Sequence, residues 1–182
     1  HTQEYEHTML LSDYMESIAG IIVTLSEFFI AMASEKLKKA LDLAKNKSAY
    51  IVIETENVKN ASLLEKLADE CRECIRSSQV KIYIENGYTN ENGRFYHNDY
   101  SDGPRLIQLV DKLNLLVAAD SFGICINVGH ANLLGINVRD MVRVCGKKTG
   151  IVHINDNDGN SDYHQMPYTF TTGRLACPTF MQ

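Results

Sequence analysis

Hydrophobic and polar positions alternate with two different periods along the chain. The segment from Val80 to Asn86 has Ile82 and Ile84 on one side and Tyr83 and Glu85 on the other, which is the period of a β-strand. Its last inward position is a carboxylate, which is costly to bury without a partner and is common where a sheet offers a ligand or a base. Further apolar runs of strand type lie at 21–25, 50–54, 122–126 and 150–154.

Segments between these runs repeat their apolar residues at helical spacing. In 34–45, Leu37, Leu41 and Ala44 share one face with lysines opposite, and we expect Ser34 to cap this helix. Further helices are predicted at 62–76, 105–114 and 138–145, and 12–19 is expected to hold the end of an earlier helix. Strands and helices alternate without tight hairpins, which is typical of a parallel sheet with crossover helices.

The spacing of the strands limits the architecture. They recur about every 30 residues, except where a polar loop at 88–103 lengthens one interval, and a complete eight-unit barrel needs roughly 240 residues at that spacing. We therefore predict a single α/β domain over 1–182, incomplete at both ends, that is either a smaller doubly wound sheet or a partial barrel. The loop at 88–103 is either a binding lid or a solvated insertion.

Composition excludes several classes of partner. The net charge of -5 at pH 7 and the pI of about 5.7 argue against nucleic acid, whose backbone requires clustered Lys and Arg. No apolar run reaches the roughly 18 residues of a membrane span, and we see no signal peptide. Five cysteines suggest a reducing compartment, and we expect the cytoplasm. Cys71 and Cys74 lack a second matching pair, so two half-buried helix cysteines are favoured over a zinc knuckle.

The parity of the strands places polar groups at one end of the sheet. One set of positions is uniformly apolar and should face the helices: Ile51, Ile53, Ile82, Ile84, Ile124, Ile126, Val152 and Ile154. The opposite set points to the interior and ends in Glu54, Glu85, Asn127 and His153. Carboxyl ends of parallel strands meet at one rim, and oxygen with imidazole ligands suits divalent Mn, Zn, Co or Mg.

More ligand-type residues follow two of these strands. His130 comes shortly after the strand at 122–126, and after 150–154 come Asp156, Asp158, Asp162 and His164. A lone loop histidine is usually solvated or capping. An Asp-x-His pair soon after a strand-borne histidine instead favours a metal site.

Four motifs together resemble a known family. They are Ile-Tyr-Ile-Glu-Asn from 82, Ile-Cys-Ile-Asn-Val-Gly-His-Ala-Asn from 124, Val-His-Ile-Asn-Asp-Asn-Asp-Gly from 152 and Asp-Tyr-His-Gln-Met-Pro from 162. In this order, between about 34 and 167, they resemble the sugar phosphate isomerase/epimerase family of the xylose isomerase-like superfamily. The resemblance implies a TIM barrel with a divalent metal, of which roughly strands three to seven are visible and strand eight is missing.

The resemblance also implies roles for individual residues. Glu85 would be both a metal ligand and a catalytic acid/base, and His153 would be a second ligand. His130 would act in catalysis by holding a substrate oxygen, or would bind a metal.

Three further positions follow from the resemblance. Asp162 and His164 match the pair that holds additional zinc in type-IV apurinic endonucleases. Asn127 occupies a metal-ligand position at which the family usually has Asp, so we expect lower metal affinity. The family's last ligand, a Glu on strand eight, has no counterpart before Gln182.

The implied function is a divalent-metal-dependent isomerase or epimerase of a sugar or sugar phosphate. It would abstract a proton next to a carbonyl and form an enediolate. The alternatives are a lyase of the same superfamily acting on oxidised glycosides, including carbon-linked ones, and a non-catalytic fragment. A DNA-repair endonuclease is disfavoured by the acidic balance. Unpaired sheet edges would favour a homo-oligomer.

Overall fold

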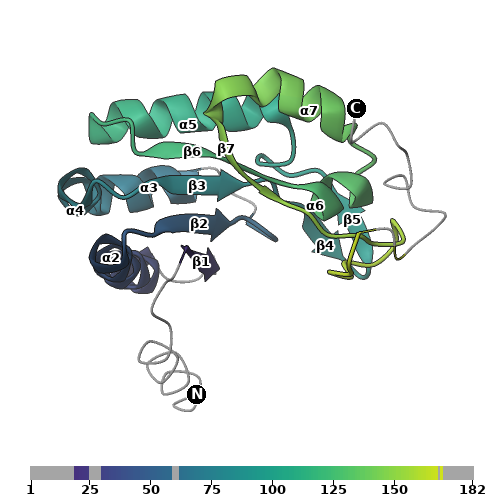
Figure 1. The fold of residues 1–182 in the computed structure, drawn as a ribbon, viewed down its shortest axis with the longest axis horizontal. Helices are drawn as coiled ribbons and strands as arrows, with labels where there is room; N and C mark the ends of the chain where they lie inside the picture. Colours follow the sequence, from purple (N-terminus) through teal and green to yellow (C-terminus); the bar gives the residue numbers. More distant parts are fainter. Residues whose placement is uncertain (1–18, 25–29, 59–61, 168, 170–182) are drawn as a thin grey trace, which may run out of the picture.

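One parallel sheet organises the protein. The computed structural model describes residues 19–24, 30–58, 62–167 and 169. Five parallel strands lie side by side in the order β1-β2-β3-β6-β7, which is also their order along the chain (Figure 1). Their bounds are β1 Gly20–Thr24, β2 Tyr50–Glu54, β3 Ile82–Glu85, β6 Phe122–Asn127 and β7 Thr149–His153. The predicted alternating α/β order with a parallel sheet is therefore confirmed.

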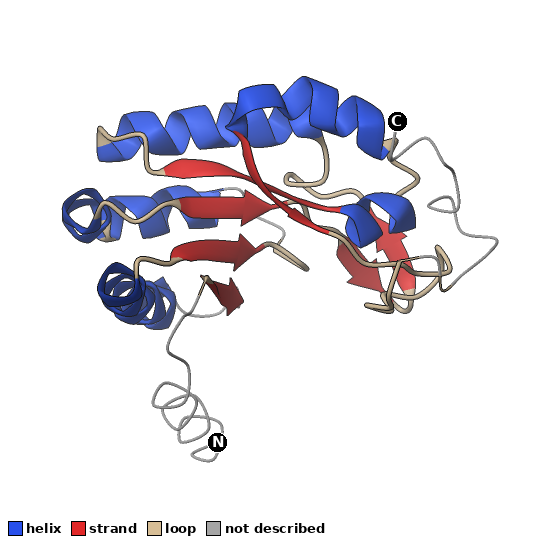
Figure 2. Ribbon diagram, viewed as in Figure 1, coloured by secondary structure: helices blue, strands red, loops and turns tan. Residues whose placement is uncertain are grey.

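Helices flank the sheet (Figure 2) and bury the isoleucines of β2, β3 and β6. Their bounds are α2 Ile30–Lys47, α3 Ser62–Glu70, α4 Arg72–Ser78, α5 Gly103–Val117, α6 Val128–Leu133, α7 Val138–Cys145 and the 3-10 turn η1 Gly146–Lys148. The apolar stripes of the long helices pack on the outward isoleucines of β2, β3 and β6, which are at most 1% exposed. Among the described helices, none has the length and hydropathy that crossing a bilayer requires.

Two helix predictions are partly wrong. One helix begins earlier than predicted, and another is divided into two. Helix α2 begins at Ile30, so Ser34 lies inside it and donates to Glu70 instead of capping. The predicted helix at 62–76 is divided at Cys71, whose backbone (φ -99°, ψ 7°) departs from helical values while its buried thiol contacts the Ser34 carbonyl. Cys71 is buried and Cys74 is exposed, so neither is half-buried. The expected helix end at 12–19 lies outside the described residues, apart from Ala19.

The polar segment at 88–103 contains a hairpin that was not predicted. Strands β4 (Thr89–Glu91) and β5 (Arg94–Tyr96) pair antiparallel. Asn92 and Gly93 connect them with φ of 55° and 80°, as in a type I′ turn. The hairpin, α6 and the segment after β7 gather at the carboxyl end of the sheet (Figure 1).

The prediction that every outward strand residue faces a helix fails on β7. Val152 is 39% exposed and Ile154 is 53% exposed. β7 is an outer strand of the sheet, and in the described residues no helix follows it along the chain to cover these side chains. This leaves apolar surface beside an outer strand.

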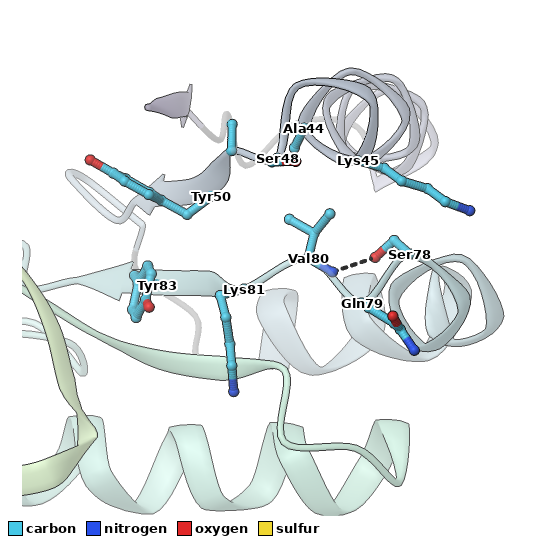
Figure 3. Close-up of a pocket in the computed structure, with 10 residues that line it drawn as sticks. Ala44, Lys45, Ser48, Tyr50, Ser78, Gln79, Val80, Lys81 and Tyr83 are labelled. Atoms are coloured by element: carbon cyan, nitrogen blue, oxygen red, sulfur yellow. Dashed lines mark hydrogen bonds between the residues drawn. The ribbon is translucent and has the colours of Figure 1, made fainter. Parts of the chain in front are cut away.

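Aromatic rings lie beneath the carboxyl-end residues on the inner face. The Tyr83 ring occupies the space over Gly123 on β6 and Gly150 on β7, since a Cβ at these glycines would lie 2.8 Å and 2.1 Å from it. Tyr50 contacts Tyr83 edge-on, with ring centroids 5.8 Å apart. An open pocket of about 430 Å³ lies at the amino ends of β2 and β3, on the far side of these rings from the carboxyl ends (Figure 3).

Candidate functional site

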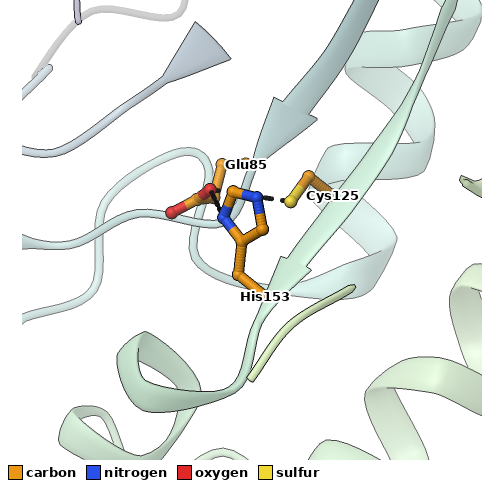
Figure 4. Close-up of side chains that lie close together, drawn as sticks. All are labelled: Glu85, Cys125 and His153. Atoms are coloured by element: carbon orange, nitrogen blue, oxygen red, sulfur yellow. Dashed lines mark hydrogen bonds and ion pairs between the residues drawn. The ribbon is translucent and has the colours of Figure 1, made fainter. Parts of the chain in front are cut away.

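Three adjacent strands bring Glu85, Cys125 and His153 together (Figure 4). In the sheet register Glu85 pairs with Cys125, and Asn127 pairs with His153. The Nδ1 atom of His153 lies 2.6 Å from Glu85 Oε2, and the Cys125 thiol donates to the same oxygen at 3.5 Å. Glu85 and Cys125 are buried, and burial raises the pKa of the Cys125 thiol.

Asn127 is fully hydrogen-bonded beside this group. Its Nδ2 donates to Glu85 Oε1 at 2.8 Å, while its Oδ1 accepts from Asn155 Nδ2 at 3.0 Å and from the His130 backbone N–H at 3.2 Å. The last bond caps α6. Gly129 leaves room for this arrangement, because a Cβ there would lie 1.8 Å from Asn155 Oδ1. Asn127 therefore orients Glu85 and starts the helix that carries His130.

His130 is buried in the first turn of α6, with both ring nitrogens in contact with polar groups. Nδ1 lies 2.8 Å from the Asn86 carbonyl, which fixes it as the protonated nitrogen. Nε2 faces Glu56 Oε1 at 3.3 Å and Asp162 Oδ2 at 3.8 Å. The ring packs edge-on against Tyr88, with centroids 5.0 Å apart. His130 is therefore held with Nε2 toward two carboxylates.

A second group of ligand-type atoms consists of His130, Asp162 and His164, which lie within 4.8 Å of one another. His164 Nε2 is 3.4 Å from Asp162 Oδ1. The Tyr88 hydroxyl donates to Asp162 Oδ2 at 2.7 Å and lies 3.2 Å from Glu56 Oε2. Burial raises the pKa of Tyr88, so this hydroxyl remains a donor at neutral pH.

In both groups, carboxylates and imidazoles shift each other's pKa toward the charged forms. Burial raises the pKa of Glu85, but hydrogen bonds from His153 and Asn127 outweigh it, and the net pKa lies below its usual value. The hydrogen bond to Glu85 raises the pKa of His153. Burial lowers the pKa of His130, but the carboxylates of Glu56 and Glu85 raise it by a larger amount. The net pKa of His130 therefore lies above its usual value. The hydrogen bond from His130 in turn lowers the pKa of Glu56.

The structure places six of the predicted site residues in these two groups. Glu85, Asn127 and His153 lie together, and His130, Asp162 and His164 lie together; His130 Nδ1 is 3.5 Å from Glu85 Oε1 and joins the groups.

Three other polar residues singled out in the sequence have different surroundings. Glu54 accepts from the Thr24 hydroxyl at 2.6 Å, between β1 and β2. Asp156 is buried and bridges to Gln165, and Asp158 accepts backbone N–H groups in its own turn.

Sequence reasoning missed Cys125, Glu56 and Tyr88. Cys125 has the inward parity of Asn127, which could have identified it. Glu56 and Tyr88 come just after the ends of β2 and β3, where the strand period no longer indicates direction. The donor set of carboxylate, imidazole and thiol fits a divalent ion, whose charge would favour loss of the imidazole protons.

Comparisons with known proteins identify the fold. No family model matches the chain, and no curated protein matches it. A D-tagatose 3-epimerase-like protein matches with a TM-score of 0.63 and 20% identity, over 87% of this chain and 64% of that one. The 3-keto-D-glucoside 4-epimerase YcjR from E. coli matches with a TM-score of 0.55 and 11% identity, over 78% and 59%. The probable 3-DHS dehydratase AsbF from Bacillus anthracis matches with a TM-score of 0.56 and 14% identity, over 94% and 61%.

These likenesses confirm the expected architecture. The structural neighbours are an epimerase-like protein, a sugar epimerase and a probable dehydratase. The chain spans less than two thirds of their length, from 59% to 64% for these three. The fold is therefore that of part of a TIM barrel.

Proposed function

We propose that this chain carries metal-binding and proton-transfer residues of a divalent-metal-dependent sugar or sugar phosphate isomerase/epimerase. The observation that carries the proposal is Glu85, a buried carboxylate kept ionised between His153 and Asn127 at the carboxyl end of the sheet. A TIM barrel places its active site at that end. The sugar epimerases among the structural neighbours support the substrate class.

The reaction follows from the position of Glu85. A divalent ion held by Glu85 and His153 would polarise the substrate carbonyl as a Lewis acid. Glu85 takes the proton from the carbon next to the carbonyl, and the electrons of the C–H bond form an enediolate in the substrate. A second carboxylic acid then delivers a proton to the opposite face of the same carbon, which gives epimerisation, or to the neighbouring carbon, which gives aldose–ketose exchange.

His130 stabilises the developing negative charge on a substrate oxygen. Because Nδ1 donates to the Asn86 carbonyl, Nε2 is a donor only when the ring is protonated. The carboxylates of Glu56 and Glu85 favour the protonated state. A protonated ring can then donate to an oxygen placed at Nε2. With Asp162 and His164, the same nitrogen could instead hold an additional metal ion.

Solvent exchange at carbon tests the proposal. We would incubate the chain with Mn²⁺ or Co²⁺ and a panel of ketoses and their phosphates in deuterated water, and detect carbon-bound deuterium by NMR. We expect incorporation that falls by about 10²–10⁴-fold in Glu85→Gln. Glu73→Gln, on the exposed face of α4, is the matched control and should not change the rate. Metal uptake without deuterium in any sugar would favour a non-catalytic role.

A lyase is the second candidate. The probable dehydratase AsbF matches 94% of this chain, and YcjR is named for a 3-keto-D-glucoside. The same proton abstraction by Glu85 would then expel a leaving group from the carbon β to the carbonyl, as the enolate electrons form a new double bond. Release of the leaving group from an oxidised glycoside, with no deuterium in recovered substrate, would favour this reaction.

A further inference from the structure

We propose that the Cys125 thiolate is a ligand of the metal, so that Glu85, Cys125 and His153 hold the ion and Asn127 does not. The donor set would then select Zn²⁺ or Co²⁺ over Mg²⁺ or Mn²⁺, because thiolate is a soft ligand and harder ions favour oxygen. This inference deepens the function proposed above and rests on its location of the metal.

The three donor atoms lie within 4.8 Å of one another, and a small shift of one side chain would bring them to the spacing around a tetrahedral ion. With bonds of about 2.0 Å to oxygen and nitrogen and about 2.3 Å to sulfur, ligand atoms around zinc lie roughly 3.3–3.6 Å apart. The Cys125 Sγ to Glu85 Oε2 distance is already 3.5 Å. The His153 Nδ1 to Glu85 Oε2 distance of 2.6 Å must open by about 0.7 Å to reach that range. His153 is 30% exposed on an outer strand, which leaves its ring room to move.

Asn127 is poorly placed to bind the same ion. A carbonyl oxygen has two lone pairs, and Oδ1 already accepts from Asn155 and from the His130 backbone N–H. Binding a metal there would break the cap of α6 or the bond to Asn155, and either loss would weaken binding. The amide is also neutral, whereas a thiolate at position 125 contributes a negative charge.

Cys125 gives up one weak hydrogen bond when it binds the ion, and the charge of the ion offsets the burial that raises the pKa of its thiol. Its thiol donates only a long, weak hydrogen bond to Glu85. On metal binding the S–H bond breaks, its proton leaves to solvent, and the sulfur electron pair is donated to the ion. The two negative charges of Cys125 and Glu85 then balance the charge of the ion, and the remaining coordination position stays available to a substrate oxygen.

Cobalt provides a direct readout that does not depend on turnover. We would titrate the chain with Co²⁺ under a phosphine reductant and record the thiolate-to-cobalt charge-transfer absorption in the near ultraviolet. Zinc competition then gives the affinity. We expect the band in the natural chain, no band in Cys125→Ser, and at least about tenfold weaker Zn²⁺ binding in that variant. Serine preserves the size of the side chain, and the melting temperature checks that the variant folds.

One control variant defines the expected pattern. Cys74→Ser removes an exposed thiol on α4 and should retain both the band and the affinity. Co²⁺ binding without a thiolate band, together with unchanged Zn²⁺ affinity in Cys125→Ser, would overturn the inference.

The test separates this inference from the proposed function. If the band is absent while deuterium exchange at carbon persists, the sugar reaction stands and the thiolate ligand is wrong. If the band is present and no sugar exchanges, the metal site stands without the reaction. If neither Co²⁺ nor Zn²⁺ binds the natural chain, both the thiolate ligand and the metal dependence are wrong.

Discussion

At position 127 an amide makes contacts that a carboxylate could not make in the metal-free protein. Asn127 Nδ2 donates to Glu85 Oε1 at 2.8 Å. An aspartate there would place two buried carboxylates against each other unless a cation lay between them. The amide therefore stabilises the metal-free state and makes it less dependent on an ion.

The first prediction exchanges that amide for a carboxylate. We expect Asn127→Asp to destabilise the metal-free chain by about 1–3 kcal/mol, because it removes a buried hydrogen bond and adds a like charge. We also expect tighter Mn²⁺ binding, because a carboxylate suits a hard ion. Denaturant unfolding with and without Mn²⁺ measures both effects.

A second asparagine provides the matched control. Asn137 caps the exposed start of α7, where its side chain accepts from the Asp140 N–H. Asn137→Asp should be nearly neutral, because Asp and Asn cap helices equally well. Equal effects at the two positions would mean that the contact with Glu85 is irrelevant.

The second prediction concerns pH in the metal-free protein. The pKa of Glu85 is lowered on folding, so its contribution to stability is present above about pH 4.3 and is lost as pH falls through the folded pKa. The pKa values of His130 and His153 are raised, so their contribution is present below about pH 6.5 and is lost as pH rises through the folded values.

Stability should therefore be greatest between about pH 4.3 and 6.5 and should fall toward pH 8. Melting temperatures in metal-free buffers across this range measure the profile. Glu85→Gln should flatten its alkaline side, because it removes the partner of His153. A melting temperature that rises steadily from pH 6 to pH 8 would contradict this assignment.

Parity along the strands predicted which way side chains point, but not which of them meet. It placed Glu85 and His153 on the same face, and the structure brings them to 2.6 Å. Cys125 shares that parity, yet a buried strand cysteine has no distinctive pattern. Glu56 and Tyr88 lie beyond the strand ends, where direction depends on tertiary contacts.

At the scale of elements, the hairpin β4–β5 supports the second group of ligand-type residues. Phe95 on β5 packs edge-on against Tyr88, with centroids 4.9 Å apart. The Tyr88 hydroxyl in turn donates to Asp162. The hairpin therefore holds the tyrosine that orients this carboxylate.

The third prediction loosens the hairpin at its turn. Gly93 has a φ of 80°, and an alanine there should cost about 1 kcal/mol locally. We expect faster amide hydrogen exchange over 89–96 in Gly93→Ala, with little change in the sheet. Gly93→Asn is the matched control, because asparagine tolerates positive φ better. Unchanged exchange in Gly93→Ala would show that other contacts hold the hairpin.

Long elements were predictable because their periodicity extends over several turns or a whole strand. Helices α5 and α7 and all five parallel strands follow the predicted segments closely. The six residues of α6 are too few for a helical period, so its start depends on the Asn127 cap. The Asn92-Gly93 pair is a strong hairpin signal, but its flanking residues are polar and the segment resembled a loop.

At the scale of the whole molecule, the sheet is an arc whose outer strands in the described residues are β1 and β7. Ile22 on β1 is 56% exposed, and Val152 and Ile154 at β7 are 39% and 53% exposed. Apolar surface beside an outer strand favours association with another strand or chain. This supports the expectation of a homo-oligomer.

The fourth prediction is self-association through the β7 side of the arc. Sedimentation over a range of concentrations should show reversible association, and Ile154→Lys should shift it to higher concentration, because burying an unpaired lysine is costly. Leu115→Lys is the matched control, since Leu115 is 82% exposed at the end of α5, away from the outer strands. If both variants weaken association equally, the association is non-specific and does not depend on the β7 side of the sheet. A chain that stays monomeric at every concentration would mean that the exposed residues of β7 do not pair with a second copy.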